Sequence, residues 1–290
     1  MSFTRIRYDR PADHVARVTL ARPEVRNAQD FTMLYEIDEA LTTAGKDHDV
    51  KVVVLAADGQ DFSAGHDLGF DMEEVKGSFT DPVVHQTTGD GQPGIEGWMP
   101  MECDAYVGLC QRWRDFPKPL IAQVQGRVIA GGLMLVWPCD LIVASRDASF
   151  RDPVVAFGVN GHEYFVHPWE WGHRKAKELL FTGNAMDAEE ARAVGMVNHV
   201  VDRDDLEDFT LRLAGRIATR PMFGLKLAKM SVNAALDAQG QSDAVRTAFA
   251  YHQIGHANAF HRFGQVMDPD GPPMVRKEIR EQSAARADHA

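Results

Sequence analysis

The sequence predicts an α/β protein with a helical C-terminal region. Short runs rich in branched apolar residues alternate with longer stretches of helical periodicity, which is typical of an α/β domain. The runs are VARVTL, VKVVVLAA, LIAQVQG and DLIVAS. After Leu206 such runs stop, and only helical patterns follow. We therefore expect a mixed core over residues 1–203 and a helical region over residues 204–266.

The helical stretches of the core carry apolar residues on one face. Within residues 31–44 these are Met33, Leu34, Ile37 and Leu41, which recur with the spacing of an amphipathic helix. Two further stretches show a similar spacing, Lys175–Thr182 and Ala188–Val194. We interpret all three as packing faces and not as sites.

The C-terminal part reads as three helices followed by a tail. The three stretches are LEDFTLRLAGRIATR, PMFGLKLAKMSVNAALDAQ and SDAVRTAFAYHQIGHANAFHRF. Residues 267–290 are broken by proline and glycine and then highly charged, so we expect a loosely ordered tail. Residues 69–111 show no clean period and are expected to form a long loop, which is either a lid over a substrate or disordered.

The length and amino-acid composition limit which classes of protein this chain can belong to. With 290 residues, 44% of them hydrophobic, the chain is long enough for one substantial core. A net charge of -11 argues against a nucleic-acid surface, which needs a clustered basic face, and an anionic small molecule would require local positive charge. Cys103, Cys110 and Cys139 lack metal-ligand spacing and are expected to be reduced, mostly buried thiols. Without an apolar leader or a membrane span, we expect a soluble cytoplasmic protein.

Two glycine turns carry the functional signal. The apolar run RVIAGGLMLVWPCD, residues 127–140, begins without a Ser, Thr, Asp or Asn cap, so a helix starting near Gly131 has amides in need of an acceptor. In FSAGHDL, residues 62–68, the small side chains around Ala64 let a ligand approach the backbone. If the amides of His66 and Gly131 face one point, they form a two-donor oxyanion hole. Each turn alone is typical of ordinary turn chemistry.

These motifs resemble the enoyl-CoA hydratase/isomerase (crotonase) superfamily. The two turns are preceded by ARPEVRNA and followed by FTGNAMDAEEARAVGMVNHVV, so the resemblance runs in order over residues 5–201. It implies a crotonase-type spiral of ββα units with a C-terminal helical region used for trimer contacts, in a homotrimer or a dimer of trimers. It also implies a coenzyme A thioester as substrate, with its carbonyl oxygen between the amides of His66 and Gly131, and no permanently bound cofactor.

The chain departs from the hydratases of this family at both acidic positions. Their first catalytic glutamate, three residues after the matched glycine, corresponds to Met134, and the second corresponds to Val154. Neither side chain transfers protons, so the two-acid addition of water is not carried over.

A replacement carboxylate is expected at Glu163. Family members that isomerise dienoyl-CoAs or dehalogenate aryl-CoAs carry a working carboxylate in this loop, and Glu163 matches that position best. Its apolar and aromatic neighbours would raise its pKa on burial, whereas the alternative is a surface glutamate in a loop. His162 is a candidate base or orienting group, and Tyr164 is a candidate hydrogen-bond donor.

For coenzyme A, the resemblance places Arg22 or Arg26 near the phosphates and the backbone of Ala28 near the pantetheine or adenine, with Ala64 as a further contact. Lys226 and its neighbour Lys229 are candidates from this subunit or an adjacent one. Each of these cations, taken alone, is more often a solvated charge.

No metal site is expected. The sequence shows His252, His256 and His261 at irregular helical spacing without acidic or thiol partners. Asp67 and Asp152 are interpreted as turn or capping residues, and Asp140 as a structural residue at the following strand.

Two functions of different classes remain open. The leading hypothesis is an acyl-CoA enzyme that stabilises a thioester enolate while Glu163 moves protons, and a single carboxylate favours isomerisation over hydration. The alternative is a non-catalytic acyl-CoA-binding protein, in which Glu163 would point to solvent.

Overall fold

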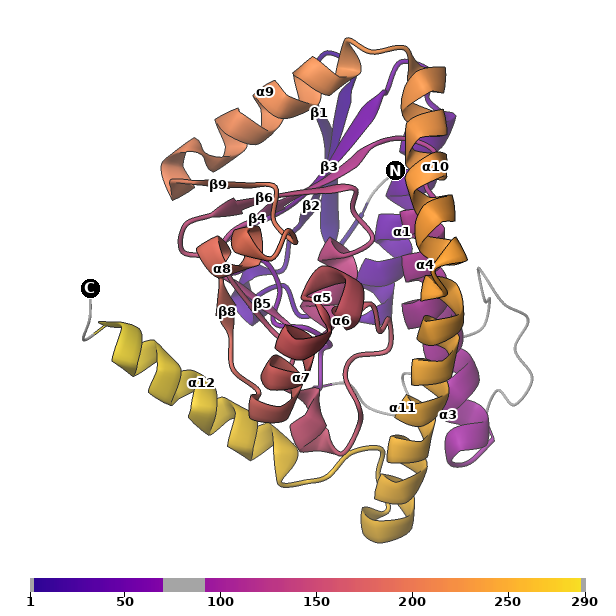
Figure 1. Cartoon of the computed structure of the whole chain (residues 1–290), viewed down its shortest axis with the longest axis vertical. Coiled ribbons are helices and arrows are strands. Elements are labelled where there is room, and N and C mark those ends of the chain that lie inside the picture. The colour runs from indigo at the N-terminus through magenta and orange to yellow at the C-terminus, as the bar shows by residue number, and fades with distance from the viewer. Residues whose placement is uncertain (1–2, 70–91, 288–290) are drawn as a thin grey trace.

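The computed structural model describes residues 3–69 and 92–287, with side chains described up to residue 282. Its strands form two sheets (Figure 1). The six-stranded sheet has the order β1-β2-β3-β4-β6-β9 and is parallel apart from the β1–β2 hairpin; a three-stranded sheet has the order β5-β7-β8. The strand bounds are β1 Ile6–Ala12, β2 Val15–Leu20, β3 Val52–Ala57, β4 Leu120–Val124, β5 Arg127–Ile129, β6 Leu141–Ser145, β7 Ser149–Arg151, β8 Met186–Asp187 and β9 His199–Val201.

Helices and helical turns connect the strands. Those before the C-terminal region are η1 Pro23–Val25, α1 Phe31–Lys46, α3 Ile95–Glu102, η2 Cys103–Gly108, α4 Leu109–Arg114, α5 Gly131–Val136, η3 Val154–Phe157, α6 His167–Glu170, α7 His173–Thr182 and α8 Ala188–Ala193. Those that follow are η4 Arg203–Asp205, α9 Leu206–Ala218, α10 Met222–Ala238, α11 Gln241–Phe263 and α12 Gly271–Ala287.

The chain winds as a spiral of repeating units. Each unit adds one strand to the large sheet and one strand to the small sheet, and a helix or helical turn then follows. β4 lies in the large sheet, β5 in the small one, and α5 comes next; β6 and β7 repeat the alternation. Ser63, after β3, forms a parallel bridge to Val128 in β5, and Val128 pairs in turn with Phe150 in β7. Three successive turns therefore stack side by side, as the predicted spiral of ββα units requires.

The predicted strands and helices of the core form as expected, because each of them buries its apolar side chains. Every residue of β3 and β4 is buried, as is usual for parallel strands covered on both faces. Asp30 is the N-cap of α1, and its side chain accepts a hydrogen bond from the Met33 amide (2.8 Å). The four apolar residues that predicted α1 are all buried in the main core.

The three predicted C-terminal helices are α9, α10 and α11. α9 buries Leu206, Leu213, Ala214 and Ala218 against β2, β3, β4 and β6, so it packs as part of the core. α10 and α11 run along one side of the molecule (Figure 1). No residue of α10 is buried.

Two expectations about order were wrong. Residues 95–111 are helical and not a loop; Pro100 inside α3 and the π-helical turn η2 disturb the regular period, which is why the sequence shows none. The tail also forms a helix, α12, which packs against η3. Residues 70–91 of the proposed lid lie outside the described residues.

Burial of the cysteines is lower than expected. All three are free thiols, but only Cys110 is buried, whereas Cys103 and Cys139 are half-buried. In the part of the chain that the structure describes, no helix combines the length and apolar character needed to cross a membrane.

Candidate active site

The two glycine turns meet in the folded chain. Gly65 has a φ of 90°, and a Cβ atom at this position would lie 2.7 Å from the carbonyl oxygen of Ile129 and 3.3 Å from the amide nitrogen of Gly131. Only glycine permits this approach, because the backbones are in contact and the φ angle is left-handed. The turn at residues 62–68 therefore lies directly against the start of α5.

The surroundings of Gly131 also disfavour a side chain. A Cβ atom here would lie 2.6 Å from Cε1 of the His66 ring, which covers the start of α5. The preceding residue, Ala130, has a φ of 47°, an unusual conformation for alanine that turns the chain sharply into the helix. No side chain caps α5. Among residues 3–69 and 92–287, neither the His66 amide nor the Gly131 amide donates to a backbone carbonyl.

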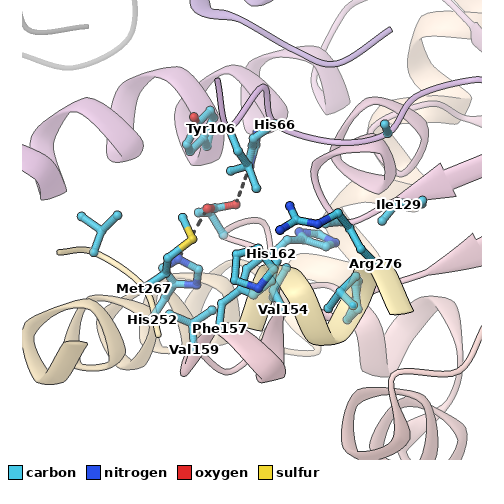
Figure 2. Close-up of a pocket in the computed structure, with 18 of the residues that line it drawn as sticks. His66, Tyr106, Ile129, Val154, Phe157, Val159, His162, His252, Met267 and Arg276 are labelled. Atoms are coloured by element: carbon cyan, nitrogen blue, oxygen red, sulfur yellow. Dashed lines mark hydrogen bonds and ion pairs between the residues drawn. The ribbon is translucent and has the colours of Figure 1, made fainter. Parts of the chain in front are cut away.

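A cavity of about 580 Å³ opens beside these turns (Figure 2). Its wall is mostly apolar, with contributions from Trp98, Val159 and Val275. Ionisable side chains interrupt this wall, as is common in sites that bind small molecules. Those on the cavity wall are Arg26, Asp61, His66, Glu102, Tyr106, Arg127, His162, Glu163, His252, His256, Arg276 and Arg280.

Glu163 lies between the imidazoles of His66 and His252 on the cavity wall. Its Oε2 atom is 3.2 Å from Nε2 of His66, and its Oε1 atom is 3.4 Å from Nε2 of His252. The His66 ring also stacks on Tyr106, with ring centroids 4.1 Å apart. The glutamate side chain is only 6% exposed, so the surface-loop alternative for Glu163 is wrong.

The pKa of Glu163 moves in the direction opposite to the one expected. Burial opposes ionisation, but the positive charge of His66 and His252 and the hydrogen bond from His66 outweigh it, so the pKa of Glu163 lies below its usual range. For His66, burial lowers the pKa, but the carboxylate of Glu163 raises it more, to above the usual histidine value. The sequence showed the apolar neighbours of Glu163 and could not show the two histidines.

His162 lies on the cavity wall but is held neutral. Burial, followed by the neighbouring His167, lowers the pKa of His162 to about 3. Its backbone amide donates to Asp152, which also contacts His167 at 2.7 Å. Asp152 therefore organises this loop, in keeping with its expected structural role.

Tyr164 does not belong to the site. Its side chain is buried in the main core and does not line the cavity, and burial raises the pKa of its phenol far above the usual value. Glu163 and Tyr164, neighbours in a bend of the chain, lie in different environments, one on the cavity wall and the other in the core. The expectation that Tyr164 donates a hydrogen bond to substrate is therefore wrong.

The two positions without acid groups lie in different surroundings. Val154 lines the cavity, whereas Met134 is buried in the core beside α4, where its carbonyl oxygen accepts from the Cys110 thiol.

The candidates for coenzyme A binding divide into two groups. Arg26 and Ala64 line the cavity, and the Arg26 side chain is largely exposed. Arg22 instead contacts Asp30 and Asp67, and it donates to the carbonyl oxygen of Ala28. Neither Arg22 nor Ala28 reaches the cavity, so in this subunit their expected contacts with coenzyme A are not supported.

The lysines of α10 also lie away from the cavity. Lys226 lines a separate surface hollow, and Lys229 pairs with Asp140 at 2.9 Å. Asp140 accepts from the Leu120 amide as well, which confirms its structural role. Asp67 accepts from the Gly69 amide and so caps the turn that follows it.

Several cavity residues were not predicted from the sequence. Arg276, from α12, points into the cavity beside His162 (Figure 2). Arg127 pairs with the buried Asp61 at 2.6 Å. The expectation that the α11 histidines lack acidic partners was wrong, because Glu102 lies 3.2 Å from His256. The spacing of His252 and His256, one helical turn apart, was the available signal.

The fold and the cavity together define an α/β protein with a site of a size suited to a small molecule. The sequence profile of the family described as enoyl-CoA hydratase/isomerase matches residues 10–88 and 103–263. The chain belongs to this family.

Individual relatives agree with this assignment. The chain is 44% identical over 261 residues to "Putative enoyl-CoA hydratase EchA13" of Mycobacterium tuberculosis, covering 88% of this chain and 82% of that protein. A crystal structure of a probable enoyl-CoA hydratase from Mycobacterium smegmatis has a TM-score of 0.81 and 47% identity, covering 91% of this chain and 98% of the other. A monofunctional enoyl-CoA isomerase from the same organism has a TM-score of 0.63 and 29% identity, covering 81% and 95%.

Proposed function

We propose that the protein isomerises an enoyl-CoA thioester, with Glu163 as the group that carries the proton. The carbonyl oxygen of the thioester accepts hydrogen bonds from the amides of His66 and Gly131. A C–H bond of the acyl chain breaks, the proton passes to Glu163, the double bond shifts through an enolate, and the proton returns to a different carbon. Members of this family use coenzyme A thioesters, and the proposal assigns such a thioester to this cavity.

The position of Glu163 carries the proposal. Its side chain is buried on the cavity wall and is hydrogen-bonded to His66, whose own amide supplies one half of the proposed oxyanion hole. This contact supports a mechanism in which the carboxylate acts next to the proposed carbonyl site. Proton transfer by a positioned carboxylate contributes about 100-fold to 10,000-fold in rate, and each oxyanion donor contributes about 100-fold to 1000-fold.

The replacement of the two hydratase acids favours isomerisation. Val154 on the cavity wall and the buried Met134 provide no proton donor or acceptor. Isomerisation needs one proton carrier, whereas hydration also needs a group that positions water. The non-catalytic alternative predicts Glu163 in solvent, and the burial of this side chain argues against it.

We also propose that the protein forms a homotrimer or a dimer of trimers in the cytoplasm. Phe223, Leu227 and Met230 recur on one face of α10 with exposures of 70%, 46% and 55%. An apolar stripe of this kind is typical of a surface covered by another subunit. A mass of one chain in light scattering would contradict the trimer.

The test is a panel of straight-chain, branched and ring-bearing 2-enoyl- and 3-enoyl-CoAs, assayed by absorbance of the conjugated thioester and by mass. Isomerisation changes the absorbance and leaves the mass unchanged, whereas hydration adds one water. In deuterated water, mass spectrometry reports proton exchange at the acyl chain. We expect Glu163→Gln to reduce turnover at least about 100-fold.

The matched control is Glu36→Gln, which makes the same chemical change at a glutamate that holds the Thr4 and Arg5 amides outside the cavity. It should retain wild-type turnover. Normal turnover by Glu163→Gln would remove Glu163 from the mechanism. Binding of acyl-CoAs by a wild-type protein that turns over none of them would support the non-catalytic alternative.

A further inference from the structure

A compact group of possible metal ligands lies in the cavity wall beyond Glu163. Glu102 ends α3, and His252 and His256 lie one turn apart on α11. One ligand atom from each residue lies within 4.8 Å of the others, and all three residues line the cavity. Their side chains are 3%, 4% and 8% exposed, respectively.

The hydrogen bonds of the two histidines fix where their protons lie. Nδ1 of His252 is 2.8 Å from the carbonyl oxygen of Gly161, and Nδ1 of His256 contacts the carbonyl oxygen of Val266. A carbonyl oxygen only accepts, so each Nδ1 carries a proton. In a neutral ring the Nε2 atom then presents a lone pair, which makes it a metal ligand.

If both rings are neutral, both lone pairs face carboxylates. Nε2 of His256 lies 3.2 Å from Oε1 of Glu102, and Nε2 of His252 lies 3.4 Å from Oε1 of Glu163. Two acceptors held face to face repel each other unless a positive charge lies between them. The site therefore requires either two additional protons or a cation.

The surroundings of His252 favour the cation. Nε2 of His256 is within hydrogen-bond distance of Glu102 at 3.2 Å, but the buried Nε2 atom of His252 makes no hydrogen bond. Ligand atoms on a tetrahedral ion with bonds of about 2.0–2.1 Å are separated by roughly 3.3 Å. Two additional protons would place two imidazolium rings with centroids 4.5 Å apart in a buried wall. One divalent ion balances the charges of Glu102 and Glu163 without that repulsion.

The outer atoms of the proposed ligands are also held. Oε2 of Glu102 accepts from Nε2 of Gln253 at 2.6 Å, and the carbonyl oxygens of Gly161 and Val266 hold the histidine rings. Such outer contacts orient the ligands in metal sites. By contrast, in the other buried group of this kind, Asp152 contacts His167 at 2.7 Å, the length of a hydrogen bond that holds a proton.

We propose that Glu102, His252 and His256 bind one divalent transition-metal ion of the Zn²⁺ type in the cavity. Two imidazoles one turn apart on a helix and a carboxylate from a second helix form a set that leaves a coordination position open. The inference does not depend on the proposed isomerase activity, because it concerns binding in the absence of substrate.

The test uses the full chain, purified without metal-affinity chromatography and stripped with a chelator. Zn²⁺ is titrated against a competing chelator, and bound zinc is counted by elemental analysis. We expect one Zn²⁺ per chain, and a Co²⁺ spectrum with the visible bands of a low-symmetry nitrogen and oxygen site. His256→Gln should weaken binding at least about 100-fold, since it removes a ligand. His261→Gln, an exposed histidine on the same helix, should bind as the wild type does.

Two further measurements test the proposal even if His256→Gln fails to fold. Gln253→Ala leaves all three ligands in place and should weaken Zn²⁺ binding about 10-fold to 100-fold. X-ray absorption of the zinc-loaded wild type should show two imidazole ligands. The proposal is overturned if the wild type binds no stoichiometric zinc, if folded His256→Gln binds as tightly as the wild type, or if the absorption spectrum shows no imidazole.

Discussion

Glu163 and His66 are separated by 97 residues in the chain, yet Oε2 of Glu163 lies 3.2 Å from Nε2 of His66. This contact joins the loop after β7 to the first glycine turn. The first glycine turn in turn touches the start of α5, since the Gly65 backbone lies against Gly131. The carboxylate of Glu163 and the ring of His66 thereby share one cavity wall, and the start of α5 lies directly behind the first glycine turn.

The first prediction concerns the start of α5. Gly131→Ala places a methyl group 2.6 Å from the His66 ring, so the ring or the amide must move. We expect kcat for an enoyl-CoA substrate to fall about 100-fold, the effect of losing one oxyanion donor. Gly215→Ala in α9, where a Cβ meets no atom within 4 Å, is the control and should keep full activity. Wild-type kcat in a folded Gly131→Ala variant would refute the role of this amide.

The second prediction concerns Arg26, an exposed cation of the cavity wall. Arg26→Gln should raise KM for an acyl-CoA about tenfold and leave kcat unchanged. The substitution removes a charge contact that is made equally in the substrate complex and in the transition state. A thioester of N-acetylcysteamine, which lacks the nucleotide, should show no change in KM. Arg216→Gln, at an exposed site on α9, is the control. An equal change in KM for both thioesters would mean that Arg26 does not bind the nucleotide.

The third prediction concerns stability and pH at the buried Asp61. Burial opposes ionisation of Asp61, but three hydrogen bonds from the guanidinium and backbone amide of Arg127 outweigh it and lower the carboxyl pKa. A lowered folded-state pKa stabilises the protein above the unfolded value, about 3.9, and this contribution is lost as pH falls through the folded value. Asp61→Asn should therefore cost about 1–3 kcal/mol at pH 7 and much less near pH 2.

Urea unfolding of wild type and Asp61→Asn at both pH values measures this difference. The exposed Asp13→Asn variant is the control and should change stability little at either pH. A cost of Asp61→Asn that is the same at pH 7 and pH 2 would show that the ion pair with Arg127 is not its source.

Local pattern predicted most of the fold. Branched apolar runs become buried strands, and the apolar face of α1 packs into the core, because burial selects these periodicities directly. The same reasoning failed at α3 and α12. There, proline and a π-helical turn break the period, and a charged stretch becomes a helix by packing against η3.

The sequence by itself determined the α/β class, the two glycine turns and the family, since each of these depends on residue type and order along the chain. The tertiary structure decided which side chains share the cavity. It placed Glu163 between His66 and His252, removed Tyr164 and Arg22 from the site, and brought Glu102 to His256. These contacts join residues far apart in the chain, so neither the pKa of Glu163 nor a buried ligand set follows from local sequence.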